Sequence, residues 1–169
     1  MNAPTAARAR FSIERRYAAS LDEAWALWTT KAGIESWWAP DGFTVRVQRI
    51  ELHPGGELIY TMTATAPEQV EFMRNAGMPL TTESRKRFTE VSPPDRISYD
   101  SLVDFVPGVE PYEFHTTVDL RRTDHGTEVT MTVDPMHDEI WTQRLTMGRE
   151  NELDNLARRI AAGYPGPVD

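Results

Sequence analysis

Polar and apolar residues alternate in seven short stretches of the chain, which predicts seven β-strands. Turns rich in proline and glycine separate several of them, and the later connections are too short for parallel crossovers. We therefore expect one antiparallel sheet. The stretches are residues 11–19, 43–52, 57–65, 83–91, 96–106, 112–121 and 127–133.

Apolar residues recur at helical spacing in four other places, which predicts four helices. The first follows Ser20, a good N-cap residue, and the last is a long amphipathic pattern that ends at Gly163. These places are residues 21–28, 31–38, 67–79 and 137–162. Together the patterns predict an α+β fold: a curved seven-stranded antiparallel sheet around a long C-terminal helix, with two short helices after the first strand and a small cap helix inserted after the third.

A curved sheet and a single long helix meet at one end and diverge at the other, which predicts a pocket between them. The inserted segment 67–79 is expected to cover this pocket, although its apolar side chains can equally be fillers of the core. The residues expected to line the pocket are Trp38, Tyr60, Met62, Phe72, Met73, Met78, Phe88, Tyr99, Val103, Phe114, Met131, Trp141, Leu145 and Arg149.

Arg149 is the sharpest candidate for ligand recognition. It shares a helical face with apolar residues, and a guanidinium beside an apolar cavity needs an anionic partner. That partner is either a ligand carboxylate or an acidic residue of the chain such as Glu152, Asp100 or Glu113, unless the side chain extends outward to solvent.

The fourth predicted strand carries a run of charges: Glu83, Arg85, Lys86 and Arg87. Such charged side chains could bind a ligand if they faced the pocket. Mixed charges are, however, typical of a solvated edge strand, and we interpret the run in that way.

The composition of the chain argues against several classes of binding partner. The 169 residues carry a formal net charge of -8, which argues against nucleic acid and anionic membranes, and there is no cysteine for disulfides or thiolate chemistry. The N-terminus lacks the apolar stretch of a secretory signal, so a cytoplasmic location is expected. We predict one domain over residues 10–162, with tails at 1–9 and 163–169.

The chemistry of catalysis and metal binding finds little support in the sequence. The four histidines, His53, His115, His125 and His137, have no metal-ligand spacing. Neither a nucleophile elbow nor a phosphate-binding glycine loop is present. We therefore predict no catalytic residue, no metal and no cofactor.

Three motifs, in this order and spacing, resemble a known family. They are residues 37–40 (WWAP), residues 54–56 (PGG) and residues 90–96 (EVSPPDR). The chain resembles START-like SRPBCC domains, in the branch related to the C-terminal domain of the heat-shock protein 90 ATPase activator. The resemblance covers residues 10–162 and includes the inserted segment. Where the family often has an aromatic residue after Gly148, this chain has Arg149.

The resemblance implies a helix-grip fold with a cavity for a small hydrophobic molecule, and it leaves three functions open. The first, which we favour, is non-catalytic binding of such a molecule, which can carry a carboxylate. The second is contact with a chaperone or with a second copy of the chain as a homodimer. The third is an enzyme of the polyketide cyclase type, which ranks last because no acid and base pair stands out.

Overall fold

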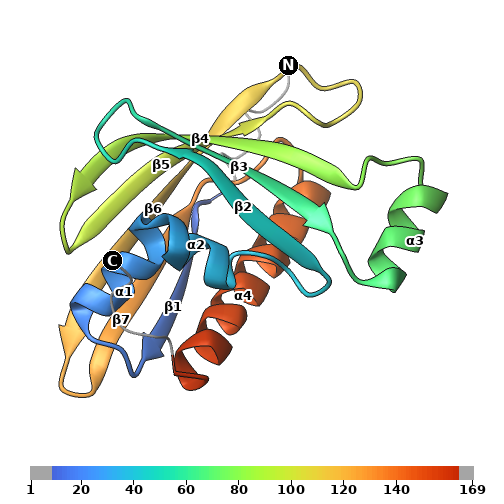
Figure 1. Ribbon diagram of the computed structural model, residues 1–169. Helices are drawn as coiled ribbons and strands as arrows, with labels where there is room; N and C mark the ends of the chain where they lie inside the picture. Colours follow the sequence, from blue (N-terminus) through green and yellow to red (C-terminus); the bar gives the residue numbers. More distant parts are fainter. Residues whose placement is uncertain (1–8, 164–169) are drawn as a thin grey trace, which may run out of the picture.

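A computed structural model describes residues 9–163 and shows the predicted elements in the predicted order (Figure 1). The predicted tails lie outside the described residues except for Ala9 and Gly163. The elements are β1 (Phe11–Tyr17), α1 (Leu21–Thr29), α2 (Lys31–Trp37), β2 (Phe43–Ile50), β3 (Glu57–Ala64), α3 (Pro67–Asn75), β4 (Thr81–Ser92), β5 (Arg96–Val103), β6 (Tyr112–Thr123), β7 (Gly126–Val133) and α4 (Glu139–Ala161).

The strands form one antiparallel sheet in the order β1-β7-β6-β5-β4-β3-β2. The chain therefore crosses from one edge of the sheet to the other only between β1 and β2, by way of α1 and α2. Register shifts interrupt β2 between Val47 and Arg49 and β4 between Phe88 and Glu90. Such bulges bend a strand and add to its twist, which curves this sheet around α4.

The two short helices begin at side-chain caps and pack closely on each other. The Ser20 hydroxyl accepts a hydrogen bond from the Glu23 amide at 3.1 Å, and the Thr30 hydroxyl accepts one from the Gly33 amide at 2.9 Å. A Cβ atom at Gly33 would lie 2.2 Å from the carbonyl oxygen of Ala26. Only glycine therefore allows α2 to approach α1 this closely.

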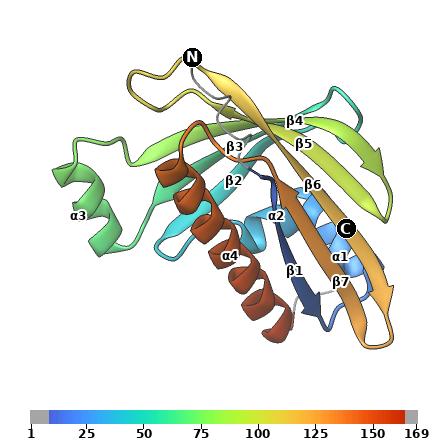
Figure 2. The same ribbon diagram turned by 180° about the vertical axis from the view of Figure 1, so that it is seen from behind.

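The long helix α4 lies along one face of the sheet (Figures 1 and 2), and its fully buried residues lie in its second half. Its buried residues are Leu153, Asn155 and Leu156. The Tyr17 hydroxyl donates to the Leu153 carbonyl at 2.9 Å, which ties this half to β1. In the first half, Met147 is 69% exposed. Helix and sheet therefore diverge toward the start of α4, as the sequence predicts.

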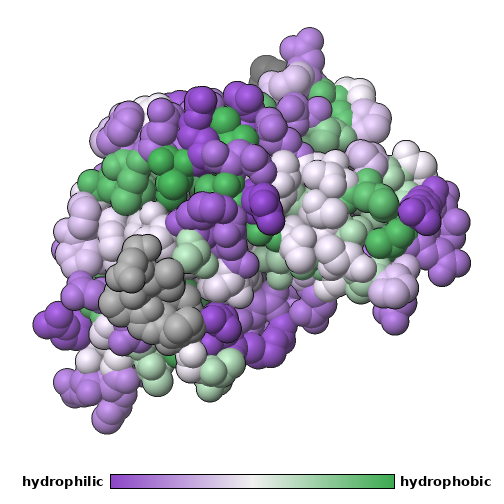
Figure 3. Space-filling view, in the orientation of Figure 1, coloured by the Kyte–Doolittle hydropathy of each residue, from purple (hydrophilic) through white to green (hydrophobic). Residues whose placement is uncertain are grey.

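The helix α3 stands away from the rest of the molecule in both views (Figures 1 and 2). It begins at Pro67, and the amide of Ala66 donates to the carbonyl of Gly42 at 3.1 Å. Apolar groups gather near the attachment of α3, while its outer tip is hydrophilic (Figure 3). This helix projects to the side of the sheet and does not lie over α4.

Candidate functional site

A cavity of about 320 Å³ lies between the sheet and the first half of α4. The strands β3 to β6 form one wall and α4 forms the other. Phe105, from the loop after β5, closes part of the mouth with its ring 5.9 Å from that of Trp141. The lining residues are Tyr60, Met62, Ser84, Arg85, Lys86, Ser101, Leu102, Phe105, Phe114, Met136, Trp141, Arg144, Leu145, Gly148, Arg149 and Glu152.

An ion pair on α4 forms the polar part of this cavity. Arg149 and Glu152 lie one helical turn apart, and Nη1 of the arginine donates to Oε1 of the glutamate at 2.7 Å. Their side chains are only 12% and 15% exposed. The Nε of Arg149 is also buried and has no hydrogen-bond partner within residues 9–163. One donor of the guanidinium is thus unsatisfied beside the cavity.

Lys86 faces this ion pair from β4. Lys86 is 5% exposed, and its Nζ donates to the Ser101 hydroxyl at 2.9 Å. Three aromatic rings surround the same nitrogen: the centroid of Tyr99 lies at 5.2 Å, that of Tyr60 at 5.8 Å and that of Trp38 at 5.9 Å. These are distances at which cation–π attraction partly replaces the hydration of an ammonium group.

Burial changes the acid–base properties of these groups. It lowers the pKa of Lys86 to about 7, with repulsion from Arg149 acting in the same direction and Glu152 opposing. It also raises the pKa of Glu152 above its ordinary value, against the attraction of Arg149 and Lys86. At this cavity the buried basic side chains of Lys86 and Arg149 therefore face the buried carboxyl group of Glu152.

The family of proteins described as activator of Hsp90 ATPase homolog 1-like matches residues 18–161, nearly the whole chain. This chain belongs to that family. The match confirms the predicted branch of the superfamily, and the observed sheet and C-terminal helix confirm the predicted helix-grip fold. No curated protein sequence matches the chain.

Solved structures of similar proteins show the same fold. An AHSA1-like protein from Aeromonas hydrophila superimposes with a TM-score of 0.72 at 21% identity, covering 95% of this chain and 99% of that one. An AHSA1 protein from Silicibacter pomeroyi gives 0.71 at 18% identity, covering 92% and 100%. A protein from Chromobacterium violaceum gives 0.72 at 20% identity, covering 88% and 94%. At these identities the likeness concerns the fold alone.

The predicted pocket residues of this AHSA1-like chain fall into three groups. Six line the cavity: Tyr60, Met62, Phe114, Trp141, Leu145 and Arg149. Five are buried in the core without lining it: Trp38, Phe88, Tyr99, Val103 and Met131. Of these five, Trp38 and Tyr99 still approach the amine of Lys86. The remaining three belong to the inserted segment.

The inserted segment does not cover the cavity. Phe72 is 62% exposed, Met78 is 47% exposed, and Met73 is buried. None of the three lines the cavity, because α3 projects from the end of β3. Phe105 lines the cavity instead, although the alternation predicted that the fifth strand extends to residue 106. That strand ends at Val103, so Phe105 lies in the following loop.

The sequence interpretation missed Lys86. The charged run on β4 is not a solvated edge, because β4 lies between β3 and β5 inside the sheet. Alternation along β4 places Lys86 on the same inward face as Phe88, which is 1% exposed. The order of the hairpins would have placed this strand in the interior of the sheet, and hence its alternate residues in the core.

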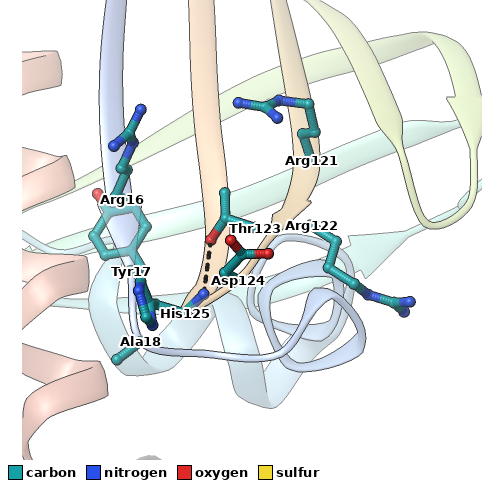
Figure 4. Close-up of a pocket in the computed structure, with 8 residues that line it drawn as sticks. All are labelled: Arg16, Tyr17, Ala18, Arg121, Arg122, Thr123, Asp124 and His125. Carbon is teal, nitrogen blue, oxygen red and sulfur yellow. Dashed lines mark hydrogen bonds between the residues drawn. The ribbon is translucent and has the colours of Figure 1, made fainter.

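A second hollow lies at the other end of the molecule, beside the turn between β6 and β7 (Figure 4). It is a surface groove of about 660 Å³. Arg16 and Arg121 border it, and both pair with Glu128, at 3.2 and 2.8 Å. Both arginine side chains are more than 65% exposed, so water competes for these contacts. This groove lacks the buried charge that distinguishes the cavity.

Two further observations concern the part of the chain from residue 9 to residue 163. Its His, Asp and Glu side chains nowhere gather into a group that could hold a metal ion. No helix in this part is both long enough and apolar enough to span a bilayer.

Proposed function

We propose that this protein binds a small amphipathic molecule in the cavity between the sheet and α4. The apolar body of the ligand lies against Met62, Phe114 and Trp141, and its anionic head, a carboxylate, lies toward Lys86 and Arg149. The observation that carries this proposal is the imbalance of charge at the site, where two buried basic groups face only Glu152.

An anionic ligand would resolve this imbalance. Because Glu152 already pairs with Arg149, the ammonium form of Lys86 is the uncompensated charge. A carboxylate beside it offsets the desolvation of the ammonium, and it can also accept from the unsatisfied Nε of Arg149. A neutral ligand offers neither effect, so the site should discriminate by charge.

The test is thermal unfolding with a panel of aromatic and medium-chain carboxylates, each matched with its amide. A carboxylate at a hundred times its dissociation constant is expected to raise the melting temperature by about 5–10 °C. The matched amide should give a much smaller shift. In Lys86→Met the preference for the carboxylate should disappear, whereas Lys31→Met removes an exposed lysine and should leave it unchanged. Equal shifts with acids and amides would contradict the proposal.

A second candidate function is contact with a chaperone, as the description of the family suggests. The observation that favours it is the exposure of Phe72 and Met78 on and beside the projecting helix α3. In this case the protein should stimulate a chaperone ATPase without any ligand, and the double variant Phe72→Ser, Met78→Ser should not. Full stimulation by that variant would exclude α3 as the contact.

A further inference from the structure

Lys86 is an unusual choice of residue for its position. Of the 18 lysine and arginine residues in the chain only two, Lys31 and Lys86, are lysines. Lys31 is exposed and pairs with Glu35 on the surface of α2. Lys86, in contrast, is buried beside the cavity, although arginine supplies nearly all the other positive charges of the chain.

An arginine would serve an electrostatic role at least as well, because its charge is permanent and its donors are more numerous. What lysine offers in addition is a primary amine that can lose its proton and act as a nucleophile. Burial and the neighbouring Arg149 lower the pKa of Lys86 to about 7, so much of it is unprotonated at neutral pH. Lys86 also lines the cavity in which we place the ligand.

We propose that Lys86 forms a reversible imine with an aldehyde or ketone group of a small ligand in this cavity. The lone pair of the amine attacks the carbonyl carbon. The two protons that the nitrogen loses end on the carbonyl oxygen, which departs as water, so that a C=N bond replaces the C=O bond. The reaction needs no oxidant or reductant. It rests on the proposed function in so far as both place the ligand in the same cavity.

The neighbours of Lys86 suit this chemistry. Its single hydrogen bond, to the Ser101 hydroxyl, orients the nitrogen and leaves its lone pair available in the neutral form. Glu152 lines the same cavity, where its carboxyl group can relay a proton from the amine to the departing hydroxyl. Arg149 can position a carboxylate elsewhere on the ligand. The preferred class of ligand is thus an aldehyde or ketone with an apolar body and an acidic group.

The test uses 4-formylbenzoate as the carbonyl probe and 4-methylbenzoate as its matched analogue without the aldehyde. The wild-type protein is incubated with the probe and sodium cyanoborohydride at pH 7, and modified peptides are identified by mass spectrometry. Lys86 should gain one carboxybenzyl group at least about tenfold faster than Lys31, which is exposed and pairs with Glu35. Labelling should saturate with probe concentration, and 4-methylbenzoate should compete with it.

Two further measurements separate this inference from the proposed function. Lys86→Arg keeps the charge and removes the amine, so it should lose the adduct and still prefer carboxylates in thermal unfolding. Lys31, an exposed lysine outside the cavity, should be labelled without saturation or competition. Stabilisation by 4-methylbenzoate without labelling of Lys86 would overturn the imine alone. Saturable labelling without such stabilisation would support the imine and count against the anionic site. Labelling of Lys31 as fast as Lys86 would also overturn the imine.

Discussion

At the scale of single residues, the site depends on a lysine and an ion pair that water cannot reach freely. The pair of Arg149 and Glu152 realises one of the alternatives predicted from the sequence, in which the arginine meets an acidic residue of its own helix. The other alternative, a ligand carboxylate, remains a prediction. Both fit together, because the Nε of Arg149 stays unsatisfied after the pair has formed.

The pKa of Lys86 makes the stability of the fold depend on pH. The value is about 7 in the folded protein and near 10.5 when the chain is unfolded, so between these limits the unfolded chain binds more protons. The free energy of unfolding should therefore rise with pH from about 7 to about 10, with a slope of up to about 1.4 kcal/mol per pH unit from this group. Below pH 7 the free-energy cost of burying the protonated amine of Lys86 no longer changes with pH. Burial raises the pKa of Tyr60, Tyr99 and Glu152, which surround Lys86, so each of these groups lowers the free energy of unfolding with rising pH where it titrates.

The variant Lys86→Met isolates this contribution. Urea unfolding at intervals from pH 6 to pH 10 should show a flatter pH dependence for Lys86→Met than for the wild type. Lys31→Met loses the same charge at an exposed position and should keep the wild-type slope. If Lys86→Met and the wild type had parallel curves, the amine would be titrating as an ordinary lysine, and the imine proposal would lose its basis.

At the scale of helices and strands, the sequence predicts where each element lies better than which way it faces. Alternation and helical spacing predict all eleven elements because backbone geometry imposes those periods. The position of α3 is different, since a nine-residue helix between two turns can fold back over the cavity or project from the sheet. Its apolar residues, Phe72 among them, are compatible with both positions, so the sequence does not decide between them.

The misinterpretation of β4 has another physical cause. Charge on a strand usually indicates solvent, and for Arg85 and Arg87, which flank Lys86, this holds: their side chains are about half exposed. Lys86 points to the opposite face, where aromatic rings and Ser101 stabilise its amine. A local run of charges cannot reveal such an environment, because the groups that create it come from distant elements. Phe88 on the same face was the available signal.

Glycine in the middle of α4 agrees with a cavity at this position. A Cβ atom at Gly148 would meet no other atom within 4 Å, so close packing does not explain the glycine, although it weakens the helix. Gly148 lines the cavity one residue before Arg149. A side chain there would enlarge the helix surface beside the site. Helix α4 therefore has a residue of low helix propensity, Gly148, at a position with open space beside it.

At the scale of the whole molecule, sheet and helix form two layers that are packed most closely along the second half of α4. The second half of α4 is fixed to the body by Leu153, by Leu156 and by the Asn155 amide, which donates to the carbonyl of Ala39 at 3.2 Å. The first half lies across the cavity, and its residues Ile140 and Met147 are more than 60% exposed. A ligand in the cavity would connect the two layers where they diverge.

Hydrogen exchange of the backbone amides tests this arrangement directly. Without ligand, amides of residues 142–148 should exchange faster than those of residues 152–160, because fewer buried contacts hold the first half of the helix. A cavity ligand such as 4-methylbenzoate, at a hundred times its dissociation constant, should slow exchange in the first half by up to about a hundredfold. The same amides in Lys86→Met should respond less, since the anionic head loses its partner. Equal protection of both halves in the free protein, or a ligand effect confined to residues 152–160, would show that the ligand does not join the two layers.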